Sequence, residues 1–154
     1  MLKQNWRTFL TENFEPKIVV FCCNWSVYPI VNEKRDFPSN IKFIKVVCGG
    51  MITPAFILKA FELGADGVLL ATCQVEDCHY ITGARRAVDV YDNTEKLINI
   101  LGFEPARVKL GWFSAHEPKI FEAALNEFIE VIKKLGPSPI RIGRKAKAEK
   151  EASL

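Results

Sequence analysis

Long apolar runs are missing from this 154-residue sequence. No window approaches the roughly 18 consecutive apolar residues that a membrane-spanning helix needs, so we expect no membrane span. The first residues, Met1 to Arg7, also lack the apolar centre of a secretory signal. We therefore expect a cytoplasmic protein, whose thiols stay reduced and whose five cysteines are free or bind a metal rather than forming disulfides.

An excess of positive charge over the body of the chain is missing as well. The formal net charge is +3, and the segment from Arg141 to Leu154 carries all of it, because five basic residues there face two glutamates. Residues 1–140 are neutral overall, which argues against nucleic acid as a partner. No Cys-x-x-Cys pair occurs, which argues against a thioredoxin-like centre and against the paired cysteine knuckles typical of structural zinc.

Four short segments rich in apolar and β-branched residues predict strands. They are Lys17–Cys23, Ile41–Cys48, Gly67–Cys73 and Val108–Phe113. Helices are predicted at Thr53 to Gly64, over 83–101, and from a capping box at Ser114–Glu117 to Gly136, with a short helix inside 24–40. This alternation predicts an α/β fold, a small flavodoxin-like or Rossmann-like three-layer sandwich with a mostly parallel four-stranded sheet in the order 2-1-3-4.

The chain divides into three parts. Residues 1–16 form an N-terminal arm, and residues 17–137 form a single α/β domain. The arm carries apolar side chains that share roughly one helical face, namely Trp6, Phe9, Leu10 and Phe14. Residues 138–154 form a basic C-terminal tail with few apolar residues, which we expect to be mobile unless a partner holds it.

Cysteines close three of the predicted strands, at Cys23, Cys48 and Cys73, and Cys78 follows in the next loop. In an open parallel sheet these strand ends share one edge, where ligands bind, so we expect the four thiols to converge there. Cys22 should point to the opposite face, because adjacent strand residues alternate. The alternative is that the thiols are scattered and simply buried.

Four converging thiols fit zinc or an iron–sulfur cluster, since both metals accept thiolate ligands. A thiol enzyme with Cys73 or Cys78 as nucleophile is a further alternative. Six residues separate Cys78 from Arg85, one more than a phosphatase loop has. The helices predicted near Thr53 and Gly83 would direct their N-termini toward this edge and favour negative charge there. Gly49-Gly50 would let the backbone approach closely.

Several segments resemble one known family, the delta (iron–sulfur) subunit of methyl-viologen-reducing, deazaflavin-non-reducing hydrogenase. The likeness covers roughly residues 17–137. The most specific match is Asp77-Cys-His-Tyr80 with Thr82-Gly83. The other matching segments are Phe21-Cys-Cys-Asn-Trp25, Cys48-Gly-Gly, Ala65-Asp-Gly-Val-Leu69, Glu104-Pro, Trp112-Phe-Ser-Ala and Asn126-Glu-Phe.

The resemblance implies a non-catalytic electron-transfer subunit that carries one 2Fe–2S cluster, bound here by Cys23, Cys48, Cys73 and Cys78. It implies partners in anaerobes and in methanogenesis: a hydrogenase or formate dehydrogenase as donor, and the flavoprotein subunit of heterodisulfide reductase as acceptor, in flavin-based electron bifurcation. Two departures stand out. Ser26 replaces a family cysteine, which leaves ligation through its oxygen as an alternative, and Gly49-Gly50-Met51 replaces a segment that ends in arginine. A zinc-stabilised or cluster-free docking scaffold is the alternative function.

Overall fold

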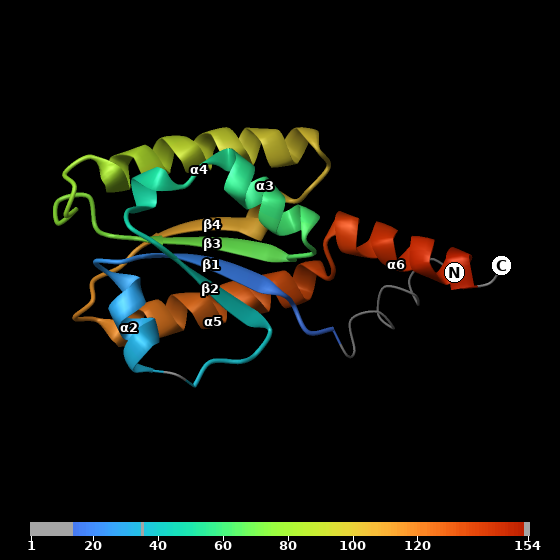
Figure 1. Cartoon of the computed structure of the whole chain (residues 1–154), viewed down its shortest axis with the longest axis horizontal. Coiled ribbons are helices and arrows are strands. Elements are labelled where there is room, and N and C mark those ends of the chain that lie inside the picture. The colour runs from blue at the N-terminus through green and yellow to red at the C-terminus, as the bar shows by residue number, and fades with distance from the viewer. Residues whose placement is uncertain (1–13, 35, 153–154) are drawn as a thin grey trace.

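The computed structural model of the chain describes residues 14–34 and 36–152. Its centre is a four-stranded sheet in which every strand pairs in parallel with its neighbour, in the order β2-β1-β3-β4 (Figure 1). The strands are β1 (Ile18–Cys23), β2 (Ile41–Val46), β3 (Gly67–Thr72) and β4 (Val108–Trp112). The predicted strands and their order are confirmed, with ends that differ by one or two residues.

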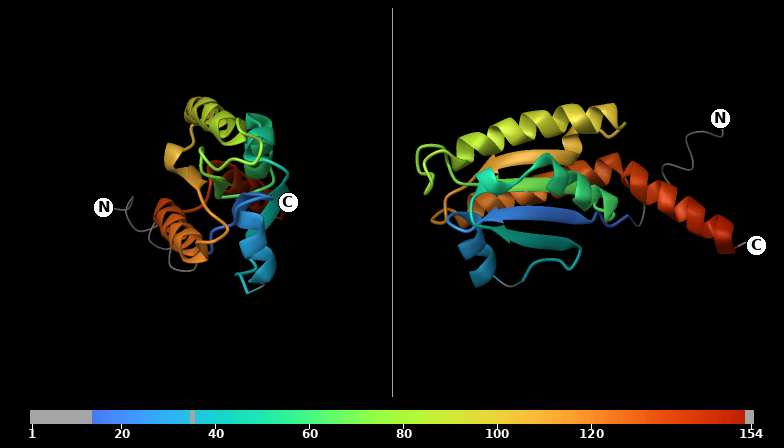
Figure 2. Two further views of the ribbon diagram at one scale, coloured as in Figure 1. Left: turned by 90° about the vertical axis from the view of Figure 1, so that its left-hand side faces the viewer. Right: turned by 45° about the horizontal axis from the view of Figure 1, so that its top comes forward.

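Helices cover both faces of the sheet. The five α-helices of the described residues are α2 (Val27–Glu33), α3 (Pro54–Glu62), α4 (Gly83–Ile100), α5 (Pro118–Leu135) and α6 (Pro139–Ala152). Two short 3₁₀ turns are η1 (Gly49–Met51) and η2 (Pro105–Arg107). The end-on view shows α3 and α4 on one face and α2 and α5 on the other, which confirms the three-layer α/β sandwich (Figure 2).

The core consists of two apolar layers, one on each side of the sheet. Alternating strand residues feed them, so that Val20 and Leu69 pack with α2 and α5, whereas Phe21 and Leu70 pack with α3 and α4. Strand β3 is buried along its whole length, as expected for a central parallel strand. Strand β2 is more exposed because it forms one edge of the sheet.

Helix boundaries follow the predicted chemistry in α3 and depart from it in α5. The Thr53 side chain accepts a hydrogen bond from the Phe56 amide, and Pro54 occupies the first turn of α3, as predicted. The capping box predicted at Ser114–Glu117 is wrong, because α5 begins at Pro118 and Glu117 makes no side-chain cap. Proline disfavours helical geometry in the residue before it, which moves the start of the helix beyond Glu117.

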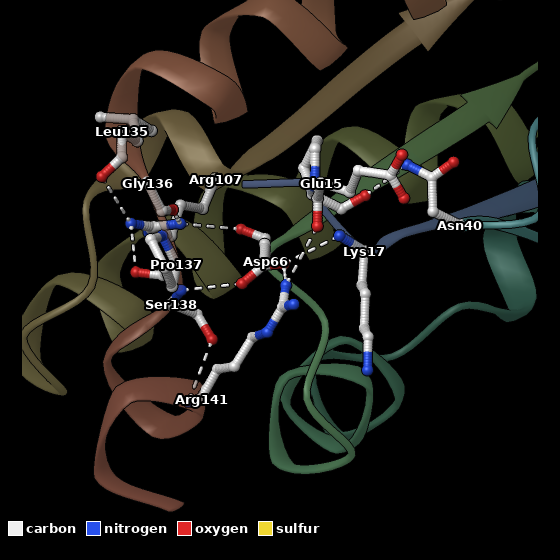
Figure 3. A network of polar contacts seen from close by, with 11 residues as sticks. Glu15, Lys17, Asn40, Asp66, Arg107, Leu135, Gly136, Pro137, Ser138 and Arg141 are labelled. Atoms are coloured by element: carbon white, nitrogen blue, oxygen red, sulfur yellow. Dashed lines mark hydrogen bonds and ion pairs between the residues drawn. The ribbon is translucent and has the colours of Figure 1, made fainter. Parts of the chain in front are cut away.

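A buried carboxylate organises the amino end of the sheet (Figure 3). Asp66 is fully buried, and its oxygens accept hydrogen bonds from the Lys17 and Ser138 amides, each at 2.8 Å, and from the Arg141 guanidinium. The Ser138 hydroxyl accepts from the Arg141 amide at 3.4 Å and so caps α6. The segment predicted as a basic tail is helical over Pro139–Ala152, and contacts of Ser138 and Arg141 with Asp66 attach its start to the domain.

Arg107 is a second buried charged residue in this region, and it hydrogen-bonds to the backbone near Asp66. Its side chain is only 1% exposed and donates to the carbonyl oxygens of Asp66 at 3.0 Å and Gly136 at 2.9 Å. Further donations reach the carbonyls of Leu135 and Pro137. The guanidinium thus joins the start of β3 to the end of α5, and α6 projects away from the sheet at this end (Figure 1).

The predicted N-terminal arm lies almost entirely outside the described residues, including Trp6, Phe9 and Leu10. Within the described part, Phe14 packs against the α2/α5 layer, and the Arg141 guanidinium lies 5.3 Å from the centre of its ring. None of the helices described for this chain is long and apolar enough to cross a membrane.

Candidate functional site

The four cysteines predicted to converge lie together at the carboxyl edge of the sheet. Cys23 is the last residue of β1, and Cys73 directly follows β3. Cys48 lies two residues beyond the end of β2, and Cys78 lies in the loop before α4. All four are buried, and they form one cluster with Ala84 at the start of α4. Parallel strands thus bring together thiols that are up to 55 positions apart in the sequence.

The four sulfurs are arranged as two neighbouring pairs. The Cys23 and Cys73 Sγ atoms lie 3.2 Å apart. The Cys48 and Cys78 side chains interact with each other, and Cys48 also experiences the charge of Cys23. Among residues 14–34 and 36–152, no group of three or more histidine, cysteine or carboxylate side chains is gathered closely enough to hold one metal ion. The four thiols thus lie in one cluster, within which Cys23 contacts Cys73 and Cys48 interacts with Cys78.

Two glycines allow the Cys48/Cys78 pair to form. A Cβ atom added to Gly83 would collide with the Cys48 Sγ and would lie 3.4 Å from the Cys78 Sγ. A Cβ atom added to Gly50 would lie 2.8 Å from the Gly83 Cα. Turn η1 and the first residue of α4 therefore approach each other to a distance that only glycine permits. A glycine at the first position of a helix, such as Gly83, indicates that another segment approaches the helix closely. The sequence alone does not identify that segment.

Backbone amides point at the sulfurs. The Gly50 amide donates to the Cys48 Sγ at 3.4 Å, and the Ala84 amide donates to the Cys78 Sγ at 3.3 Å. The second donor belongs to the first turn of α4, where free N–H groups and the helix dipole favour negative charge. Other amides that interact with Cys23 or Cys73 are those of Trp25, Gly49 and His79. The backbone thus favours thiolates at this site.

The thiols of the Cys23/Cys73 pair differ in acidity. The Cys23 and Cys73 sulfurs share a hydrogen bond, and this bond, together with the Trp25 and Gly49 amides, lowers the pKa of Cys23 to about 6 against the opposing effect of burial. The same hydrogen bond, together with burial, raises the pKa of Cys73. Burial raises the pKa of Cys48. This hydrogen bond thus favours the charged form of Cys23 and the neutral form of Cys73.

Cys22 lies on the other side of the sheet. It belongs to the core layer beneath α2 and α5, with Val20 and Leu69, and is fully buried. Its thiol donates a long hydrogen bond to the Val20 carbonyl at 3.6 Å. Burial, with a smaller contribution from the charge of Cys23, raises the pKa of Cys22 to about 12. The structure thus separates Cys22 from the other four cysteines, as strand alternation predicts.

Ser26, at the position where the family has a cysteine, is buried beside the cluster. It lowers the pKa of both Cys23 and Cys73, which places its hydroxyl near both sulfurs. Its Oγ nevertheless forms no hydrogen bond of full geometry with the described residues. A buried hydroxyl without a hydrogen bond of full geometry is uncommon in proteins, and this one lies beside two thiols.

Aromatic side chains from the loop that follows Cys23 and the loop that carries Cys78 pack against one another. The Trp25 ring stacks on His79 with centroids 3.6 Å apart and planes 13° apart. Tyr80 meets the same Trp25 ring edge-on at 6.5 Å, and both Trp25 and Tyr80 are 45% exposed. The His79 imidazole is therefore engaged in stacking, and the histidine contributes its backbone amide to Cys73. Arg85 and Arg86 lie exposed in the first turn of α4.

Comparisons with known proteins identify the family of this chain. The family model "Methyl-viologen-reducing hydrogenase, delta subunit" matches residues 18–136. The chain is 41% identical over 140 residues to the iron-sulfur subunit of the F420-non-reducing hydrogenase vhc of Methanococcus voltae, covering 86% of this chain and 94% of that protein. It is 38% identical over 132 residues to the iron-sulfur subunit of the F420-non-reducing hydrogenase of Archaeoglobus profundus, covering 83% and 96%.

A relative of another kind contains this unit as a part. The chain is 36% identical over 126 residues to one subunit of the ferredoxin/F(420)H(2)-dependent CoB-CoM heterodisulfide reductase of Methanosarcina acetivorans. The match covers 79% of this chain but only 16% of that protein. The same unit therefore occurs both as a short chain and as a minor part of a much longer one.

Proposed function

The chain belongs to the methyl-viologen-reducing hydrogenase delta subunit family, and from this we propose that it is an electron-transfer subunit that carries one 2Fe–2S cluster. The ligands would be Cys23, Cys48, Cys73 and Cys78. The names of its relatives support a role in a hydrogenase and heterodisulfide reductase complex. The observation that carries the proposal is the burial of four thiols from four chain segments in one cluster.

The residues at the site fit such a group. Thiolate is the ligand that iron–sulfur clusters require, and each iron of a 2Fe–2S cluster takes two of them. Two neighbouring pairs of thiols, Cys23 with Cys73 and Cys48 with Cys78, supply that pattern. Zinc also accepts four thiolates, so analysis of zinc, iron and sulfide decides between the two metals. The buried Ser26 hydroxyl adds a polar atom beside Cys23 and Cys73.

The surrounding residues would set the properties of the site. A bound cluster supplies one-electron chemistry. The amides of Gly50 and Ala84 donate to sulfur and thereby stabilise negative charge on the ligands. Val75 packs against the four buried cysteines and adds an apolar contact. Burial of the four sulfurs lowers the local dielectric constant, which is one of the terms that control reduction potential.

We place the protein between a hydrogenase or formate dehydrogenase and the flavoprotein subunit of heterodisulfide reductase, in the cytoplasm of an anaerobe, in flavin-based electron bifurcation. The support is that this unit is similar both to separate hydrogenase subunits and to part of a heterodisulfide reductase subunit. A unit that occurs as a separate subunit of a hydrogenase and as part of a heterodisulfide reductase subunit is suited to carry electrons between these two enzymes.

The test is chemical analysis of the protein after anaerobic purification. We expect about two irons and two acid-labile sulfides per chain, with visible charge-transfer absorption, because each pair of thiolates would bind one iron. Zinc without sulfide would reject the cluster and favour the zinc-stabilised docking scaffold. Protein without metal that still assembles with its partners would favour the cluster-free scaffold.

A further inference from the structure

The face of the sheet that carries α3 and α4 leaves strand β2 uncovered. A groove of about 940 Å³ runs there between β2, β1 and α3, and it reaches Arg141 at the start of α6. Its floor consists of strand residues of one face, among them Val19, Phe21 and Ile44. Its wall is formed by one side of α3, with Phe56 and Leu63. The groove is thus a place beside α3 where a three-layer fold would hold another helix.

Large apolar side chains are exposed around this groove. Ile44 is 43% exposed, Phe56 49% and Leu63 70%. Phe56 also stacks on Phe21 with ring centroids 6.5 Å apart, which orients its ring along the groove. Single exposed apolar residues are ordinary, but a group that lines one concave surface marks an interaction site.

The charges around the groove are almost all positive. The lining residues include the five cations Lys17, Lys42, Lys45, Lys59 and Arg141, and Glu15 is the one acid among the described residues that line it. Lys59 pairs with Glu62 and Arg141 pairs with Asp66, so the excess of positive charge comes from Lys17, Lys42 and Lys45. The Arg141 side chain is held in place by the buried carboxylate of Asp66 (Figure 3). This pair balances the charge of Arg141, so the three lysines remain as the positive groups that an acidic partner would meet.

We propose that this groove binds an acidic amphipathic helix of a partner protein. Its apolar side chains would lie on Ile44, Phe56 and Leu63, and its carboxylates would face the surrounding lysines. Strand β2 has six residues and spans about 20 Å, which about 13 residues of helix would match. An apolar floor within a basic border favours this occupant over a nucleic acid, whose backbone offers no apolar face.

The N-terminal segment of this chain is the competing occupant, because Glu15 lines the groove. Residues 1–13 contain Trp6, Phe9 and Leu10, but their charges are Lys3 and Arg7 against Glu12. A segment with a positive net charge does not complement a basic border. The charge therefore favours a partner helix.

The first experiment identifies the occupant directly. Leu63 is replaced by the photoreactive residue p-benzoylphenylalanine in the full chain, which is isolated with its natural partners and irradiated. Ile100 at the end of α4, which is 81% exposed, provides the matched control position. We expect a crosslink from position 63, absent from position 100, to a peptide of another protein with negative net charge and apolar residues at helical spacing. A crosslink to residues 1–13, to a second copy of the chain or to a peptide without negative charge would overturn the proposal, as would the absence of a position-specific crosslink.

The second experiment tests the charges. The double variant Lys17→Glu/Lys42→Glu should associate with the complex about tenfold more weakly or worse at low salt. The difference from the wild type should shrink as the salt concentration rises. The control, Lys96→Glu/Lys119→Glu, reverses two exposed lysines on α4 and α5 that do not line the groove. Equal losses in both doubles, or no loss in either, would contradict the proposal.

This inference rests on the proposed function only in assuming that the protein has a stable partner. Iron analysis tests the cluster, and the crosslink tests the groove, so the two proposals can fail separately. The groove variants should retain the iron and absorption of the wild type, since the cysteines lie at the other end of β1 and β3. A chain without iron that still shows the crosslink would reject the cluster and retain the groove. A chain that contains iron but shows no crosslink would retain the cluster and reject the groove as a docking site.

Discussion

Cys22 and Cys23 are adjacent in the sequence, yet their replacement by alanine should have opposite effects. Cys23→Ala removes one thiol of the Cys23/Cys73 pair, whose sulfurs lie 3.2 Å apart. An iron bound there would lose an anionic ligand, so iron and sulfide should fall to a small fraction of the wild-type content. Replacement of Cys48, Cys73 or Cys78 by alanine should have the same effect.

Cys22→Ala should leave the iron content unchanged. The side chain is fully buried in the opposite core layer, and its one hydrogen bond is a long donation to the Val20 carbonyl. Removing one sulfur atom from such a site destabilises a protein by about 1 kcal/mol. For a chain of this length that loss lowers the melting temperature by about 3 °C.

The assay combines iron and sulfide analysis, visible absorption and thermal unfolding of both variants, all under anaerobic conditions. Because each variant loses one buried sulfur, Cys22→Ala serves as the packing control for Cys23→Ala. Loss of iron from Cys22→Ala together with retention in Cys23→Ala would refute the argument from strand alternation. Unchanged iron in all four single variants at the cluster would refute the ligand set itself.

Three further predictions address other parts of the molecule. Gly83→Ala should lower the iron content, since the new Cβ would collide with the Cys48 Sγ, even though alanine favours a helix by about 1 kcal/mol; iron analysis and circular dichroism separate the two effects. Arg107→Met should lower the free energy of unfolding in urea by about 3–5 kcal/mol, since it leaves buried carbonyl groups without donors; a change below about 1 kcal/mol would contradict the role assigned to the network. Removal of residues 143–154 should weaken association with the complex and reduce its salt dependence while the absorption remains; unchanged association at every salt concentration would reject a role for α6 in docking.

The sequence was sufficient for those features that depend on local pattern and on topology. Continuous apolar runs such as Gly67–Thr72 identify buried parallel strands, and strands of that kind require crossovers that leave their carboxyl ends at one edge. Once the order 2-1-3-4 is accepted, the meeting of Cys23, Cys48 and Cys73 follows, because each lies within two residues of a strand end.

Features that depend on distant partners could not be predicted in this way. Helix α6 has a Ser-Pro start signal, but its position depends on Arg141 meeting Asp66, which lies 75 positions earlier. The capping box at Ser114–Glu117 satisfied the sequence pattern and failed because Pro118 begins the helix. The groove beside β2 depends on which half of the sheet α3 covers, and that choice is made by packing.

The two ends of the sheet carry different tasks, and this has a consequence for how the protein can change. The cysteines and their amide donors belong to loops at the carboxyl ends of the strands. The Asp66 network and α6 lie at the amino ends, and the groove extends from there along β2. Substitutions at one end therefore leave the contacts of the other intact, and effects of well-separated sites add nearly independently. A single short chain can in this way keep its thiol site while its docking surface adapts to another partner.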